Sequence, residues 1–293
     1  MKDYMIRAID KSGKLRIFVA KSTNLVEKAR NIHNTSPTAT AALGRALTGG
    51  VIMGSMMKNN KDLLTLRISG DGPLGKILIV ANKNGQVKGE VGFPMADVPS
   101  RSDGKLDVGT LVGKNGTITT IMDLGLKDPY IGQSSLVSGE IAEDIANLYV
   151  TSDQVPTAVS LGVLIDKDIS CIAAGGFMIQ LMPGISDSEI SMIEESLSNI
   201  EPISTMISKG FAPEEIATKL LSKFEVEILD KLDLEYYCDC SREKIEKVII
   251  SLGKKEIQDI IDEDGQAELV CHFCNTKYQF NKEDLIRLLL TIQ

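Results

Sequence analysis

Four cysteines near the end of the chain are the residues best suited to chemistry. Cys238 and Cys240 stand one residue apart in YYCDCSREK, and Cys271 and Cys274 enclose two residues in CHFC. Four thiolates suit a tetrahedral divalent ion, and zinc is the commonest occupant of such a site. A Cys-x-x-Cys at a hairpin turn is a typical half-site, whereas the one-residue spacing of the first pair is unusual. The sequence therefore predicts a Zn²⁺ site.

A zinc ion held by four cysteines has no open position for water or a substrate, so the pattern excludes a hydrolytic metal site. Each thiol pair is also close enough along the chain to form a disulfide once the metal leaves. A bridge between Cys238 and Cys240 would close a strained ring, and strained disulfides are readily reduced. The spacing therefore favours a reversible thiol switch. His272 is a weaker candidate ligand, because its ring would tend to point away from a metal held by both neighbours.

Two other functions stay open on this evidence. A constitutive structural zinc-ribbon module, binding protein or nucleic acid, would use the same ligands, but the region from CDCSREK to CHFC shows no excess of basic residues. A thiol oxidoreductase would need a reactive Cys-x-x-Cys at a helix N-terminus in a β-α-β setting, whereas CHFC lies in a hairpin pattern. With only two histidines and no nucleophile elbow, we expect that the protein is not an enzyme.

The overall composition narrows the partners and the compartment. The 293 residues carry a formal charge of −8, and the pI is about 5.0. A negative protein repels phosphate backbones, so nucleic acid is not an expected partner. The opening MKDYMIRAID lacks the apolar core of a signal peptide, and the apolar run 171–185 is too short to span a bilayer. We therefore expect a cytoplasmic protein without a membrane partner, with its cysteines reduced.

Residues 1–184 show the patterns of an α+β domain, with a largely antiparallel sheet and packed helices. Alternating apolar and polar residues on either side of Asn84-Gly85 predict a hairpin with a type I′ turn. Ser36-Pro37 is typical of a helix start, and the small apolar residues that follow predict a core helix. Strands joined by short turns, with helices grouped between them, favour antiparallel pairing.

Residues 185–232 predict a linker made of short helices only. Each helix is about two to four turns long, so it is marginal in water and depends on packing against the rest of the protein. The apolar residues of this segment recur at helical spacing, which places them on one side of each helix. The seven residues on these faces are Ile190, Ile193, Leu197, Ile216, Leu220, Leu221 and Phe224.

Residues 233–293 form the predicted zinc-binding domain. Ser241 and Asn281 are candidate helix caps, and CHFC lies at the turn of a hairpin between the two helical regions. A unit of about 60 residues has a small core, and structural zinc contributes on the order of 10–16 kcal/mol to the folding of small peptides. Loss of the metal would unfold this domain and could melt the metastable linker beside it. The seven apolar residues would then be exposed, and exposed aliphatic surface binds unfolded proteins.

Several stretches resemble one known family from end to end. They are PTATAALGRALTGG, GDGPLGK, LVSGEIAEDIA and AAGGFMIQLMPG in the first domain, and CDCSREK, SLGKKEI and CHFCNTKYQF in the last. The chain is similar in these stretches to the redox-regulated heat-shock chaperones also called 33 kDa chaperonins. The combination of Cys-x-Cys with Cys-x-x-Cys is highly specific to that family.

The resemblance implies an ATP-independent holdase, with residues 1–184 as its chaperone core. In this family the reduced protein holds zinc through four cysteines, which correspond here to Cys238, Cys240, Cys271 and Cys274. Oxidants such as peroxide, with heat, release the zinc and form disulfides between near neighbours, here Cys238–Cys240 and Cys271–Cys274. The linker then unfolds, the active form tends to form a homodimer, and it binds unfolding client proteins. The seven apolar linker residues are therefore the predicted client-binding residues.

Overall fold

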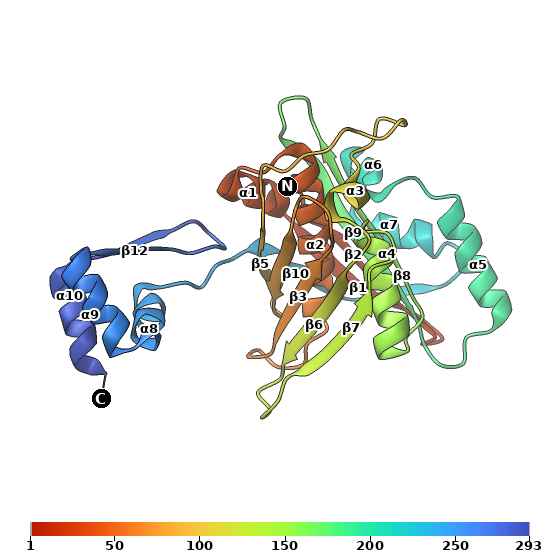
Figure 1. The fold of residues 1–293 in the computed structure, drawn as a ribbon. Helices are drawn as coiled ribbons and strands as arrows, with labels where there is room; N and C mark the ends of the chain where they lie inside the picture. The colour runs from red at the N-terminus through yellow and green to blue at the C-terminus, as the bar shows by residue number, and fades with distance from the viewer. Residues whose placement is uncertain (1, 293) are drawn as a thin grey trace. The chain divides into compact units, whose positions relative to one another are not determined.

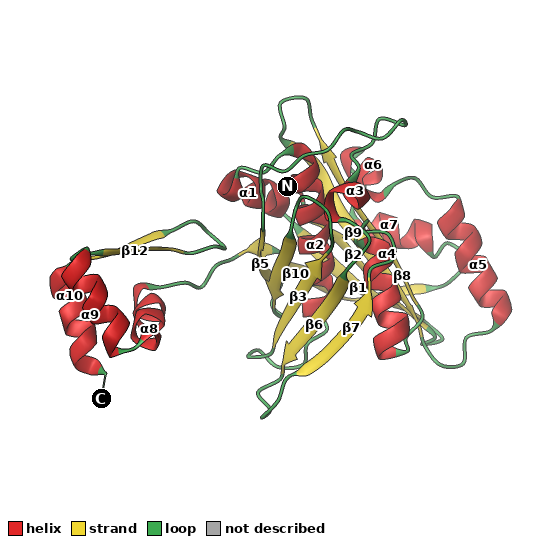
Figure 2. Cartoon of the chain, in the orientation of Figure 1, coloured by secondary structure: helices red, strands yellow, loops and turns green. Residues whose placement is uncertain are grey.

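The computed structural model describes residues 2–292, and they separate into two compact units. The first unit runs to Tyr237 and the second begins at Cys238. The first unit combines antiparallel sheets with helices, which confirms the predicted α+β class (Figures 1 and 2). Among the described helices, none combines the length and the apolar character that a membrane crossing needs.

One sheet of the first unit has five strands in the order β10-β1-β2-β9-β8, and all of its neighbours are antiparallel. The bounds of its strands are β1 (Tyr4–Asp10), β2 (Leu15–Lys21), β8 (Thr157–Ile165), β9 (Cys171–Leu181) and β10 (Val226–Asp233). Strands from the two ends of the first unit therefore share one sheet, and β10 and β8 lie at its edges.

The second sheet has six strands in the order β11-β5-β4-β3-β6-β7. The bounds of its strands are β3 (Leu63–Ser69), β4 (Lys76–Ala81), β5 (Gln86–Val91), β6 (Thr117–Asp123), β7 (Tyr130–Ser135) and β11 (Glu235–Tyr236). The short β11 pairs in parallel with β5, and the other described neighbours in this sheet are antiparallel. β4 and β5 form the predicted hairpin, and Gly85 in its turn has φ of +75°, a conformation that the turn requires and glycine adopts without strain.

The helix α2 (Pro37–Ser55) joins the two sheets, because it packs on strands of both. The Ser36 hydroxyl accepts a hydrogen bond from Ala39 N at 3.1 Å, which confirms the predicted helix start. Its glycines permit close contact: a Cβ at Gly50 would lie 2.6 Å from Ile79 Cγ2. The remaining helical elements between the sheets are α1 (Thr23–His33), α3 (Val108–Val112), α4 (Ala142–Leu148) and the π-helical turn η1 (Tyr149–Asp153).

Three short helices lie between β9 and β10, and their presence was predicted from the sequence. They are α5 (Asp187–Ser198), α6 (Ile203–Ser208) and α7 (Pro213–Leu220). Their apolar residues form one buried cluster with a face of the five-stranded sheet, to which Ile17 and Ile179 belong. The linker is therefore folded against this sheet, which supplies the packing that helices so short require.

The expectation that residues 185–232 contain helices only is wrong for the end of that range. Val226–Asp233 is the edge strand β10, which pairs with β1. The stretch VEILDKLD mixes apolar and charged residues, and most of it is exposed. Local periodicity is weak in such a strand, and its partner lies at the other end of the first unit, so tertiary pairing decides its structure.

The second unit is small. Its elements are α8 (Arg242–Leu252), α9 (Lys254–Glu263), β12 (Ala267–Val270), β13 (Lys277–Phe280) and α10 (Lys282–Thr291). β12 and β13 form the predicted hairpin. The buried part of its core consists of Ile249, Ile257, Ile261, Phe280, Leu285 and Leu288. A core of this size supplies little folding free energy, so a second source of stability is expected.

Candidate metal centre

The first cysteine pair lies in the chain that leads into α8. Cys240 directly precedes Ser241, whose hydroxyl accepts a hydrogen bond from Lys244 N and caps the helix. Asp239, between the two cysteines, forms an ion pair with the ammonium of Lys244. The cap and the ion pair together fix the Cys-x-Cys segment to the first turn of α8.

The second pair lies in the turn between β12 and β13. Cys271 N donates to Thr276 O at 2.9 Å, and Asn275 N donates to Cys271 O at 2.8 Å. Asn275 has φ of +56°, a left-handed conformation in which asparagine is enriched. The turn therefore folds back on itself and brings Cys274 next to Cys271.

The four sulfur atoms all lie within 4.8 Å of one another. Cys238 Sγ is 3.7 Å from Cys271 Sγ, and Cys240 Sγ is 3.3 Å from Cys274 Sγ. A tetrahedral zinc site with Zn–S bonds of about 2.3 Å separates its sulfurs by about 3.8 Å. The structure thus brings all four predicted ligands together in a set that fits a tetrahedral, thiolate-binding metal ion. His272 is not a member of this group of ligand atoms.

The electrostatics of the site favour a bound cation. Burial raises the pKa of the Cys238 thiol. Burial also opposes ionisation of Cys274, but hydrogen bonds with the Thr276 hydroxyl and backbone lower its pKa to about 7. Tyr278 Oη donates a hydrogen bond to Cys240 Sγ at 3.1 Å. Four thiolates this close repel one another, and a divalent ion removes that cost because a coordinating thiol loses its proton.

Arg242 connects the two halves of the site. Its guanidinium donates to Gln279 O at 2.9 Å and to the Asp284 carboxylate at 2.7 Å. It also lies over the Phe280 ring, 4.4 Å from the centroid. This residue follows the Cys-x-Cys pair, and its partners belong to the hairpin and the helix after the Cys-x-x-Cys pair. Sequence reasoning missed Arg242, since those partners lie 37 and 42 residues away.

The predicted client-binding residues are largely covered in the folded linker. Ile193, Ile216, Leu220 and Leu221 are buried, and Ile190, Leu197 and Phe224 are half-buried. Most of them pack in the cluster formed with the five-stranded sheet. These residues do not form an exposed surface in this conformation, so their role in client binding stays a prediction that requires unfolding of the linker.

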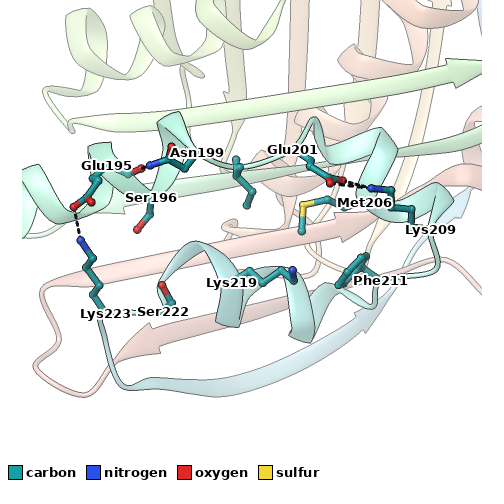
Figure 3. Close-up of a pocket in the computed structure, with 11 residues that line it drawn as sticks. Glu195, Ser196, Asn199, Glu201, Met206, Lys209, Phe211, Lys219, Ser222 and Lys223 are labelled. Atoms are coloured by element: carbon teal, nitrogen blue, oxygen red, sulfur yellow. Dashed lines mark hydrogen bonds and ion pairs between the residues drawn. The ribbon is translucent and has the colours of Figure 1, made fainter.

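The linker helices are loosely joined at their outer side. A pocket of about 580 Å³ opens among α5, α6 and α7 (Figure 3). Two ion pairs span its rim, Lys223 with Glu195 and Lys209 with Glu201, and each of the four side chains is about half exposed. Exposed ion pairs contribute little to stability. The outer side of the linker therefore adds little stability to that of the buried cluster beneath it.

Comparisons of the sequence and of the fold with known proteins all match one protein family. The family model described as Hsp33 protein matches residues 3–281. A "33 kDa chaperonin" of Thermoanaerobacter sp. (strain X514) is 48% identical over 289 residues, which cover 99% of this chain and 98% of the relative. One of Bacillus cytotoxicus is 46% identical over 292 residues and matches 100% of both chains.

A solved structure gives the same result for the fold. The crystal structure of the 33 kDa chaperonin (heat shock protein 33 homolog) of Thermotoga maritima has a TM-score of 0.91 and 34% sequence identity to this chain. The match covers 99% of this chain and 98% of that chain. The similarity therefore includes the linker and the cysteine-bearing unit as well as the first unit.

Proposed function

The chain belongs to the Hsp33 family, and from that premise we propose that it is a redox-regulated, ATP-independent holdase chaperone of the cytoplasm. The reduced protein binds Zn²⁺ through Cys238, Cys240, Cys271 and Cys274 and is inactive. Oxidation releases the zinc and unfolds the linker, residues 185–232. The uncovered surface binds unfolding client proteins and prevents their aggregation, and the active form is a homodimer.

The observation that carries this proposal is the four-sulfur cluster in a unit with few other sources of stability. The sulfurs lie within 4.8 Å of one another, and six apolar residues form the buried core around which the unit folds. Zinc binding to such a unit is coupled to its folding. Loss of the thiolate ligands therefore removes the zinc-binding free energy, which is the main contribution to the folding of the unit.

The oxidation step requires the two thiolates of one pair, peroxide and two protons from the solvent. The thiolates lose two electrons as one S–S bond forms, and peroxide takes up these electrons with the two protons and becomes two water molecules. The pairs proposed are Cys238 with Cys240 and Cys271 with Cys274. A sulfur in a disulfide is no longer a thiolate ligand, so the site loses its affinity for the metal. The strained Cys-x-Cys ring is readily reduced, which makes the step reversible.

The chain between the metal centre and the linker offers a route for transmission. Tyr236, two residues before Cys238, is buried, and its hydroxyl donates to Gly89 O at 2.9 Å. Lys28 Nζ donates a hydrogen bond to the Tyr236 carbonyl at 2.9 Å. These two hydrogen bonds and the buried ring of Tyr236 form an anchor that holds β11 on the six-stranded sheet. Unfolding of the second unit can therefore destabilise the linker only after this anchor is released.

β10 precedes this anchor and is the weaker part of the route. Most of its side chains are exposed, and its ion pairs, such as Arg7 with Asp230 and Lys2 with Asp233, are exposed as well. Such pairs add little to the backbone hydrogen bonds with β1. We therefore infer that release of β10 precedes the unfolding of α7, α6 and α5.

Zinc release, thiol oxidation and chaperone activity measured in the same samples test this function. Mild peroxide at raised temperature should release one zinc and remove four free thiols, and only the oxidised sample should suppress light scattering by an unfolding client. Cys271→Ser should abolish the switch. Cys171→Ala is the matched control, because Cys171 lies outside the cluster and its loss should leave the switch intact.

Retention of zinc after oxidation, or scattering that oxidation does not change, would contradict this function. The four cysteines would then be permanent structural ligands, and the second unit would be a constitutive zinc-ribbon module for protein interaction.

A further inference from the structure

The five-stranded sheet ends in a strand whose outer edge pairs with no other strand among residues 2–292. The sheet order places β8 beyond β9, with which it pairs (Figure 1). The other edge strand, β10, carries charged residues along its length, as edge strands that resist pairing usually do. β8, with the sequence TAVSLGVLI, carries no charged residue. It therefore lacks the usual protection against pairing with another chain.

The hydrogen-bond pattern identifies which main-chain groups of β8 point outward. Leu181 N donates to Pro156 O at 3.0 Å, so this pair is a hydrogen-bonded pair of the antiparallel ladder. Such pairs alternate along a ladder. In the register given by Leu161 opposite Gly176, Ser160 and Gly162 therefore bond to β9.

The N–H and C=O groups of Val159, Leu161 and Val163 consequently face away from β9. Within residues 2–292, no hydrogen bond joins these groups to a partner. They supply three donors and three acceptors in a row, spaced as an extended polypeptide requires.

A groove of about 650 Å³ runs along this edge and is lined by residues 159–166 of the chain. One wall is formed by the start of α4 and by Arg45, Arg101, Gly104, Lys105, Leu106 and Glu140. The Arg45 guanidinium on this wall forms an ion pair with the Glu140 carboxylate, which also lines the groove. The groove therefore follows the outer edge of β8 along most of its length.

The opposite wall belongs to the linker. It consists of residues 202–205, at the start of α6. This wall lies close to the strand, since a Cβ at Gly162 would be 2.9 Å from Ile203 Cγ2 and 3.0 Å from Ser204 N. Only glycine at this position permits the approach. In the folded linker, the start of α6 therefore packs directly against β8, and unfolding of residues 185–232 would remove one wall of the groove.

We propose that the outer edge of β8 binds an extended segment of a non-native polypeptide by adding it to the sheet as a further strand. The inference rests on the proposed chaperone function and assigns a site for its client. Main-chain pairing of this kind depends little on the client's side chains, which suits a protein that must hold many different unfolded chains. The wall from α6 confines this pairing to the form with the linker unfolded.

Amide hydrogen exchange resolved by residue tests the proposal in the oxidised full-length protein. The probe is reduced and carboxymethylated lactalbumin, which stays unfolded. Exchange at Val159, Leu161 and Val163 should slow by about tenfold or more when the probe binds, since each amide gains an acceptor. Ser160 and Gly162 are internal controls, because their amides already bond to β9.

The outcomes separate this proposal from the proposed function. Unchanged exchange at the three amides, in a sample that suppresses client aggregation, would overturn the β8 site and leave the chaperone function standing. A sample that never suppresses aggregation would overturn both. Protection that appears without probe and grows with protein concentration would show that a second copy of this chain occupies the edge, which also overturns the client site.

A pair of variants provides an independent test. Val163→Pro removes one outward donor, and proline is tolerated at an edge position whose N–H faces away from the sheet. Val163→Ala removes the two methyl groups of the valine and keeps the donor. Both should retain zinc when reduced. After oxidation the proline variant should bind the probe roughly fivefold more weakly than the alanine variant, as the loss of one hydrogen bond implies. Equal affinities would overturn the proposal.

Discussion

Ile216→Ala should turn on the chaperone without oxidation. Ile216 lies on α7, is 0% exposed and packs in the cluster between the linker and the five-stranded sheet. Truncation of a fully buried isoleucine to alanine costs about 3 kcal/mol, from lost burial and the cavity left behind. That cost is paid only while the linker is folded, because the side chain is exposed in the open form. The substitution therefore shifts the equilibrium toward the open linker.

The size of the shift follows from the same figure. A change of about 3 kcal/mol raises the open population by about two orders of magnitude, and Ile216→Val, at about 1 kcal/mol, raises it roughly fivefold. The two variants should form a graded series in the zinc-bound, reduced state. Thr218→Ala is the matched control, since Thr218 is an exposed residue of the same helix and its truncation leaves the buried cluster intact.

The assay combines three readings on reduced protein: bound zinc, amide exchange in residues 187–220, and suppression of client light scattering. We expect zinc to be retained, exchange to accelerate in the order wild type, Val, Ala, and suppression to increase in the same order. Faster exchange without any gain in suppression would refute the reasoning, because an open linker would then be insufficient for client binding. Unchanged exchange would show that the linker is not marginal.

Further predictions concern the metal centre and the linker caps. Removal of zinc by a chelator should abolish the helical circular dichroism of the second unit and leave the sheets of the first intact, as limited proteolysis would show. Arg242→Ala should weaken zinc binding about tenfold or more, because the two half-sites are no longer held together. Arg242→Lys should restore only part of the zinc affinity, because one ammonium cannot replace the planar guanidinium. Zinc affinity is measured by competition with a dye, and equal affinities of wild type and Arg242→Ala would contradict this prediction. Hydrogen bonds from the Ser186 hydroxyl and backbone and from Lys14 lower the pKa of Glu189 from 4.5 to about 2. The stability that the ionised Glu189 carboxylate adds to α5 is therefore present above pH 4.5 and is lost as the pH falls toward 2. Amide exchange in α5 should rise over that interval, and Glu189→Gln should remove the dependence.

The features that depend on short stretches of sequence could be predicted. Cysteine spacing identified the four sulfurs that the structure brings together, because few residue types bind zinc and their number limits the alternatives. The start of α2 at Ser36-Pro37 and the hairpin around Asn84-Gly85 follow from local backbone preferences, and both are present. Local chemistry that is rare or strongly restricted is therefore readable without a structure.

Features set by distant partners could not be predicted in this way. β7 and β11 escaped notice, since the first is polar and largely exposed and the second spans two residues. β10 forms because β1 offers it a partner, over 200 residues earlier in the chain. The closest sulfur contacts join opposite half-sites, Cys238 with Cys271 and Cys240 with Cys274. Sequence spacing alone groups each cysteine with its neighbour in the chain.

The strand order of the five-stranded sheet also affects how the linker refolds and the protein returns to its inactive form. β1, β2, β9 and β8 pair with one another without β10, so they can remain as a template when the linker leaves. Refolding then closes a loop of roughly 45 residues between β9 and β10, and the entropic cost of closure grows only slowly with loop length. The returning helices would compete with a bound client for the same sheet. Re-reduction could thereby drive client release by displacement, with no nucleotide consumed.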